Sequence, residues 1–281
     1  MLRDLWVAYD GSKEADAALD LALGLARRGA RVTVAHVEEI DADPPAASGS
    51  SLAVEALGLG RKAWRAHVAG IAARNAPDVE LRVCSASGHP PAVLLGLLEW
   101  ARPDLVVAGT HGVGGPWNAL RGGVSQCLRH RASCPVLLVR RPCARNTSRV
   151  VVVGVDAPEP AAGALALGQR IALAAGARVH LVHVGSPLGL AGDPEAGGRL
   201  LLDWAAARLD VPAPAIAAEL RAGDPGQALL AACSARRPLA VVVGRRPRSA
   251  FRGVIGRSVT DSLINDATCP VGLAAPVAAA A

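Results

Sequence analysis

A tandem repeat limits the fold of this chain more than any other feature of its 281 residues. The segment Val-Ala-Tyr-Asp at residues 7–10 recurs as Val-Gly-Val-Asp at 153–156, an offset of 146. Ser-Cys-Pro-Val at 133–136 recurs as Thr-Cys-Pro-Val at 268–271, an offset of 135, so the second copy is the shorter one. We expect two domains of one kind, covering residues 1–143 and 144–281.

Each copy alternates short apolar runs with longer segments of helical period. In the first copy we predict strands at 5–9, 31–37, 80–85, 105–109 and 136–140, with helices at 14–28, 52–75, 90–101 and 124–131. In the second copy we predict strands at 150–155, 178–184, 215–221, 240–244 and 271–274, with a shortened second helix at 200–209. This alternation predicts the α/β class: two open parallel sheets, each covered by helices on both faces.

The composition indicates a folded, soluble protein with 51% hydrophobic residues. The net charge is +6, but the basic residues lack the interleaved aromatics of single-strand nucleic-acid binders, so nucleic acid is not an expected partner. No apolar run reaches the roughly 20 residues of a membrane span, and no signal-peptide pattern is present, so we expect a cytoplasmic protein. The 6 cysteines form no C-x-x-C pair, so neither a zinc site nor a disulfide framework is expected. The arginine-rich composition, with abundant Ala, Gly and Pro, indicates a bacterial genome rich in GC.

Two loops of the first copy follow predicted strands and carry residues suited to binding a ligand. In an open parallel sheet the ligand crevice lies beyond the carboxyl ends of the strands, where the strand order reverses. Asp10-Gly11-Ser12 follows the first strand, where an acid can accept hydrogen bonds. The same three residues are equally suited to capping the next helix.

The second loop is rich in glycine. Gly-Thr-His-Gly-Val-Gly-Gly at 109–115 follows the fourth strand, and Gly-Gly-Val-Ser at 122–125 opens a helix. Spaced glycines let backbone N–H groups point at an anion, and a helix N-terminus adds partial positive charge. The pattern has the chemistry of a phosphate cradle, although surface loops also use glycine for turns alone.

These landmarks resemble one known family. Gly109, Gly112 and Gly122 are separated by two and by nine residues, and this spacing resembles the G-2x-G-9x-G-(S/T) nucleotide motif of the universal stress protein family. The segments at 7–12, 35–37 and 133–139 are also similar to that family, and the resemblance covers nearly the whole chain, twice. It implies a tandem member with two Rossmann-like domains of strand order 3-2-1-4-5, and ATP between strands one and four.

Carried over position by position, the resemblance implies a site in the first domain. Ala8 and Asp10 would border the base and ribose, and the backbone of Val37 would meet adenine. Ribose and phosphates would contact Ala108, Gly109, Gly112, Gly122, Gly123, Val124 and Ser125. Gly123 stands where the family has Ser or Thr, which removes a hydroxyl donor, and Ser125 is a candidate to replace it in part.

The second copy departs further from the motif. At the constant offset of 135, Pro247 and Arg257 stand in place of two of the glycines; a one-residue gap would align Gly256 instead of Arg257, but Pro247 remains. Proline lacks an N–H donor, and both residues carry a Cβ where the backbone must approach a phosphate. We expect the second pocket to be blocked or remodelled, although the guanidinium of Arg257 could itself hold a phosphate.

We expect a stress-associated regulator that binds ATP, with or without magnesium, and acts on a regulatory protein partner. The sequence has neither a P-loop lysine nor a pair of carboxylates, the groups that would support fast phosphoryl transfer. We therefore predict no catalytic and no metal-ligating residue. Slow ATP hydrolysis, using His111 or a group from a partner, and a nucleotide-free scaffold remain alternatives. In this family single domains commonly dimerise through their last strands, which implies an intramolecular pseudo-dimer here and leaves a homodimer open.

Overall fold

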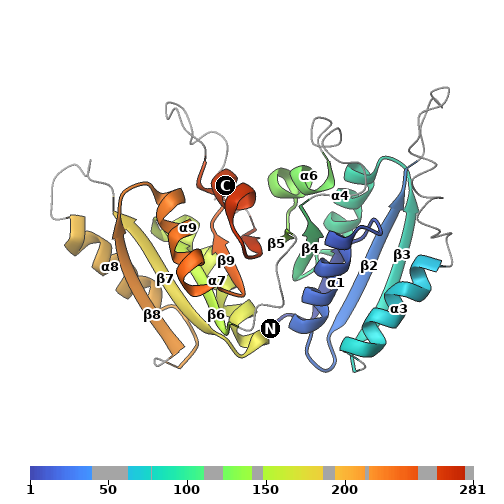
Figure 1. The fold of residues 1–281 in the computed structure, drawn as a ribbon, viewed down its shortest axis with the longest axis horizontal. Helices are drawn as coiled ribbons and strands as arrows, with labels where there is room; N and C mark the ends of the chain where they lie inside the picture. Colours follow the sequence, from blue (N-terminus) through green and yellow to red (C-terminus); the bar gives the residue numbers. More distant parts are fainter. Residues whose placement is uncertain are drawn as a thin grey trace. The chain divides into compact units, whose positions relative to one another are not determined.

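The computed structural model describes residues 1–39, 63–76, 78–110, 123–140, 148–185, 194–212, 215–245 and 258–275. The chain divides into two compact units, Leu2–Arg141 and Pro142–Ala281. Each unit is a parallel sheet with helices packed on it (Figure 1). The predicted α/β class is confirmed.

The first unit has five parallel strands in the order β3-β2-β1-β4-β5, the order that the family resemblance implies. The strands are β1 (Asp4–Ala8), β2 (Arg31–Glu38), β3 (Glu80–Ser87), β4 (Leu105–Gly109) and β5 (Val136–Val139). The helices are α1 (Lys13–Leu25), α3 (Ala63–Asn75), α4 (Pro90–Ala101) and α6 (Val124–Arg131).

The second unit repeats this topology in the order β8-β7-β6-β9-β10. Its strands are β6 (Val150–Val155), β7 (Arg178–Gly185), β8 (Ile216–Ala222), β9 (Ala240–Val243) and β10 (Val271–Leu273). Its helices are α7 (Pro158–Ala175), α8 (Pro194–Ala206), α9 (Pro225–Arg236) and α10 (Val259–Asp266).

Some helix ends differ from those predicted. Helix α1 ends at Leu25 rather than at residue 28, because the chain turns at Arg27–Ala30, where the Ala30 N–H donates to the Arg27 carbonyl and Gly29 has φ 82°. Helix α8 occupies Pro194–Ala206, whereas the prediction was 200–209. Proline at its first position costs no intrahelical hydrogen bond, so it favours this earlier start. The predicted helix segment at 52–62 lies outside the described residues.

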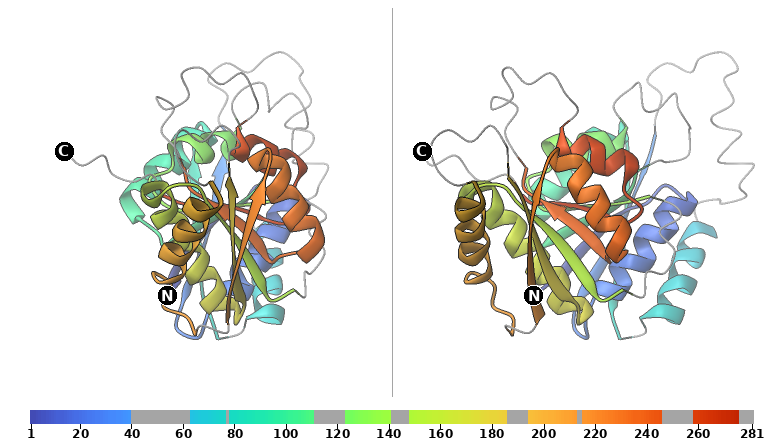
Figure 2. Two further views of the ribbon diagram at one scale, coloured as in Figure 1. Left: turned by 90° about the vertical axis from the view of Figure 1, so that its left-hand side faces the viewer. Right: turned by 60° about the vertical axis from the view of Figure 1, so that its left-hand side comes forward.

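The cores consist of consecutive buried Val, Leu and Ala on the central strands. All four residues of β5 and of β9 are buried, and so are the three middle residues of β1. Such continuous runs are typical of strands covered on both faces, because both sets of side chains face helices. Helix α1 packs on β1 and β4 while α4 packs on β2 and β3, and helices lie on both sides of each sheet (Figure 2).

The two units also repeat each other in backbone detail. Gly88 and Gly223 both have positive φ before the third described helix, at 136° and 108°. Arg102 and Arg237 both end that helix in the left-handed conformation, with φ of 47° and 45°. Each pair is 135 residues apart, so the sequence repeat is also a repeat of backbone geometry.

Close packing of α7 on the second sheet depends on Gly168. A Cβ at this position would lie 2.5 Å from Cγ2 of Val153, which is fully buried on β6. A β-branched side chain in a central strand cannot move away from such a Cβ, so helix α7 would have to shift.

We predict that Gly168→Ala lowers the free energy of unfolding by about 1–3 kcal/mol, the usual cost of overpacking. Gly197→Ala in α8 is the matched control, since no atom lies within 4 Å of the place that its Cβ would take. It should be neutral or stabilise by up to about 1 kcal/mol through helix propensity. Urea unfolding of the full chain measures both changes, and equal stabilities of the two variants would contradict the packing argument.

Candidate functional site

The strand order of the first unit reverses at β1. This strand pairs with β2 on one edge and with β4 on the other. In register, Ala8 lies opposite Ala35 on β2 and Ala108 on β4. Chain segments leave β1 and β4 in opposite directions here, which opens a crevice at their carboxyl ends. Both flanking positions are alanine, so the side chains on the two strands are small here.

The loop after β1 contains two polar residues, and the hydrogen bonds show which of them caps α1. Ser12 is the N-cap of α1, because its Oγ accepts the Ala15 N–H at 3.1 Å. Asp10 precedes the cap, and its Oδ1 accepts the Ser12 N–H at 3.0 Å across a turn in which Gly11 has φ 82°. Asp10 is exposed, so its carboxylate lies at the mouth of the crevice.

The other wall of the crevice begins where β4 ends. Gly109 is its last residue, and the N–H of Thr110 donates to the carbonyl of Val139 at 2.9 Å. Ser125 Oγ donates to the carbonyl of Thr110 at 3.0 Å, which ties the start of α6 to the end of β4. Its one hydroxyl proton is used there, so Ser125 does not supply the donor missing at Gly123.

Helix α6 begins without a side-chain cap. Gly123 is its N-cap and makes no side-chain hydrogen bond to the first turn. The N-cap residue has no side chain to accept the N–H groups of the first turn. A helix N-terminus attracts anions. Arg129, His130 and Arg131 in the last turn complement the opposite end of the helix dipole.

Gly112, Gly122 and His111 lie outside the described residues. The structure therefore brings together Ala8, Asp10, Ala108 and Gly109 with the start of α6 at Gly123, Val124 and Ser125. Val37 lies near the carboxyl end of the neighbouring strand β2, opposite Ala86 of β3, and is half-buried.

An aromatic cluster that the sequence did not indicate backs the β1–β2 side of the crevice. The ring of Trp64 on α3 lies 4.9 Å from that of His36 and 5.9 Å from that of Tyr9, centroid to centroid. The imidazole Nδ1 of His36 is 2.9 Å from the carbonyl oxygen of Tyr9. Tyr9 precedes Asp10 and His36 precedes Val37, so this cluster lies directly behind two of the predicted site residues.

Tyr9 is also tied to two helices. Its hydroxyl donates to Asp16 Oδ1 on α1 at 2.7 Å, and His67 Nε2 on α3 is 3.1 Å from the same oxygen. Burial, together with this hydrogen bond, raises the pKa of the Tyr9 phenol well above its usual range, so the phenol remains protonated. Periodicity and motif spacing cannot reveal such a cluster, because its members come from four separate elements.

The corresponding place in the second unit is filled differently. At the repeat offsets, Gly154 and Val243 correspond to Ala8 and Ala108. A Cβ on Gly154 would lie 3.1 Å from Cγ1 of Val243, so the larger side chain already occupies this place.

The second unit also caps the helix that corresponds to α6. Ser258 is the N-cap of α10: its Oγ accepts the Asp261 N–H at 3.1 Å and donates to Asp261 Oδ2 at 2.6 Å. A carboxylate thus lies at the helix end where the first unit has no side-chain cap. Pro247 and Arg257 lie outside the described residues.

A charged cluster in the second unit was likewise not predicted. Glu219 on β8 is bound by His180 at 2.9 Å, Arg221 at 2.7 Å and Arg236 at 2.8 Å. Burial lowers the pKa of His180, and the three partners lower the pKa of Glu219 against its own desolvation. The cluster ties the edge strand β8 to β7 and α9, which is a structural role.

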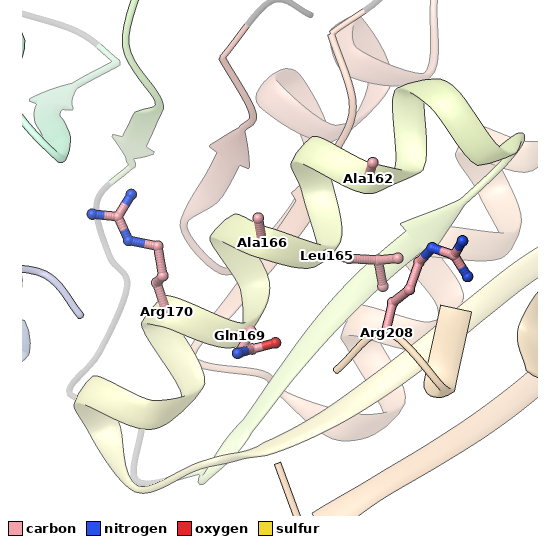
Figure 3. A pocket seen from close by; sticks show the side chains of 6 residues that line it. All are labelled: Ala162, Leu165, Ala166, Gln169, Arg170 and Arg208. Carbon is pink, nitrogen blue, oxygen red and sulfur yellow. The ribbon is translucent and has the colours of Figure 1, made fainter. Parts of the chain in front are cut away.

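The described part of the second unit also has a shallow groove of about 350 Å³ along α7. It is lined by Ala162, Leu165, Ala166, Gln169, Arg170 and Arg208 (Figure 3). Gln169 Oε1 accepts the Asp210 N–H at 3.0 Å, so this polar group serves the local fold. None of the predicted site residues lines the groove.

The model of the universal stress protein family matches residues 1–140 and again 147–273. The chain belongs to the universal stress protein family and carries two of its domains in tandem.

Individual relatives agree with this assignment. A curated relative from Thermus aquaticus, named "Universal stress protein in QAH/OAS sulfhydrylase 3'region", is 32% identical over 142 residues, which are 50% of this chain and 100% of the relative. A universal stress protein structure from Archaeoglobus fulgidus covers 98% of this chain and 96% of its own at 19% identity, with a TM-score of 0.72. That likeness concerns the fold.

A universal stress protein from Arabidopsis thaliana was solved with AMP bound. It covers 52% of this chain and 97% of its own at 18% identity, with a TM-score of 0.33.

Among the described residues, no helix combines the length and the apolar character needed to cross a membrane. The same residue ranges contain no group of three or more His, Cys, Asp or Glu side chains placed to hold a metal ion.

We predict that Tyr9→Phe lowers the free energy of unfolding by about 1–2 kcal/mol, because it removes a partly buried hydrogen bond to a carboxylate. Asp16→Asn is the comparison variant: it keeps an acceptor for Tyr9 and removes only the negative charge, which lies in the first turn of α1 and faces the partly exposed His67, so it should cost less. Urea unfolding measures both, and a Tyr9→Phe variant as stable as the unaltered chain would show that this hydrogen bond contributes nothing.

Proposed function

We propose that the first unit binds an adenine nucleotide, ATP, in the crevice at the carboxyl ends of β1 and β4. The observation that carries the proposal is the N-terminus of α6, whose N-cap residue Gly123 offers no capping side chain, at the point where the strand order reverses. The glycines of the G-2x-G-9x-G motif fall on the loop that joins β4 to this helix. Backbone N–H groups and a helix dipole are suited to phosphate groups.

Each predicted residue has a role in this proposal. Backbone N–H groups of Gly112 and of residues 122–125 hold the phosphates. Ala8, Ala108 and Gly109 are small where the ribose must approach the sheet, and Asp10 and the backbone of Val37 lie on the side that would face the base. Any magnesium would enter with the phosphates of the nucleotide.

The second unit does not bind ATP in this proposal. The carboxylate of Asp261 lies at the N-terminus of α10, where it would repel a phosphate. The side chain of Val243 stands where the first unit has the smaller Ala108. Pro247 removes a donor from the equivalent of the phosphate loop.

Membership of the universal stress protein family supports a regulatory role in the stress response, in which nucleotide occupancy of the first unit controls contact with a protein partner. We propose that the protein acts in the cytoplasm by binding. A bound nucleotide held by backbone groups requires no catalytic side chain.

The predicted consequence of Gly122→Val is loss of ATP binding, with the dissociation constant raised at least about 100-fold, because a branched side chain stands where the backbone must approach a phosphate. Isothermal titration of the full chain measures it, with circular dichroism to confirm folding.

Arg257→Val is the matched control, since residue 257 is the equivalent position in the second copy and should leave ATP affinity unchanged. A folded Gly122→Val variant with unaltered affinity would remove the motif from the site. Loss of binding in Arg257→Val instead would place the nucleotide in the second unit.

A further inference from the structure

A histidine contact occurs in both units at the end of the central strand. His36 Nδ1 lies 2.9 Å from the carbonyl oxygen of Tyr9, and His183 Nδ1 lies 2.8 Å from that of Val155. A carbonyl oxygen can only accept a hydrogen bond, so Nδ1 carries the proton and donates in each case. We name this contact the histidine clasp.

In the first unit the clasp joins two strands just beyond their last paired residues, and in the second unit it joins the last paired residues themselves. The β1–β2 ladder runs to Ala8 opposite Ala35, and the Tyr9 N–H still donates to the Ala35 carbonyl at 2.9 Å. The next carbonyl, that of Tyr9, is held by a side chain of β2 instead of by its backbone. Asp10 follows Tyr9 immediately, and Val37 follows His36. One side chain therefore sets the separation of the two segments that flank the base in the proposed site.

The clasp is supported from behind by a helix in each unit. In the first unit the buried ring of Trp64 packs against both His36 and Tyr9. In the second unit the backbone of α8 takes that place, since a Cβ on Gly198 would lie 2.9 Å from Cδ2 of His183. Neither imidazole can rotate away from its carbonyl without displacing a helix.

We infer that His36 is a positioning residue for the base-binding side of the nucleotide site: by holding the Tyr9 carbonyl it fixes Asp10 relative to the backbone of Val37. This inference rests on the proposed function. His36 does not touch the phosphates, which the proposal places at the β4–α6 side of the crevice.

The test compares two substitutions of His36, one that keeps the aromatic ring and one that keeps the hydrogen-bond donor. His36→Phe keeps a ring against Trp64 and removes the donor, whereas His36→Asn keeps an N–H near the place of Nδ1 and removes the ring. Because one hydrogen bond with its positioning effect is lost, we expect His36→Phe to raise the ATP dissociation constant about tenfold or more. His36→Asn should stay within about threefold, since it retains the donor.

A second ligand separates positioning of the base from general damage to the fold. Inorganic tripolyphosphate carries the phosphates without the base, so its affinity, measured by competition with ATP, should be the same in His36→Phe as in the unaltered chain. His183→Phe is the matched control, because it removes the same clasp from the second unit and should leave ATP affinity unchanged. If His36→Phe does not fold, His36→Leu against His36→Asn carries the same comparison.

The outcomes distinguish this inference from the function on which it rests. ATP binding that is equal in the unaltered chain and in His36→Phe would overturn the inference and leave the proposed function standing. Equal losses for ATP and for tripolyphosphate would also overturn it, because the damage would then not be confined to the base. No ATP binding by the unaltered chain would overturn both.

Discussion

The parallel pairing of β1 on both of its edges is the constraint on which the rest of the first unit depends. Strand β1 pairs with β2 on one side and with β4 on the other. The chain after β1 therefore continues toward β2, while the chain after β4 continues toward β5 on the opposite side. The crevice between those exits is a consequence of topology. In the proposed site, the small residues Ala8 and Ala108 leave space for the ribose, and the N-terminus of α6 attracts the phosphates.

The two units share one backbone but differ in side chains at the place of the proposed site. Arg102 and Arg237 adopt the same left-handed conformation at equivalent places, so the repeat is maintained in fine backbone detail. The chemistry differs at a few side chains. Where the first unit has Gly123, which carries no side chain to cap the helix, the second has Ser258, whose Oγ accepts the Asp261 N–H and donates to the Asp261 carboxylate.

Much of the fold could be predicted from the sequence, because each apolar run and helical period is a local pattern and the repeated landmarks show the same order of elements twice. The strands fall within a few residues of their predicted positions. Helix ends were less predictable, since the end of α1 depends on the turn around Gly29. The side chains behind the crevice could not be predicted, because Tyr9, His36 and Trp64 meet only after three elements have packed. The site residues themselves remain a prediction.

A crystal structure of the full chain grown with ATP tests the central claim most directly. We predict one nucleotide per chain, in the first unit, with its phosphates at the N-terminus of α6 and its base between Asp10 and Val37. The carboxyl ends of β6 and β9 should hold none. A nucleotide in the second unit, alone or in addition, would contradict the account, because a helix end already occupied by Asp261 would then be able to bind phosphate.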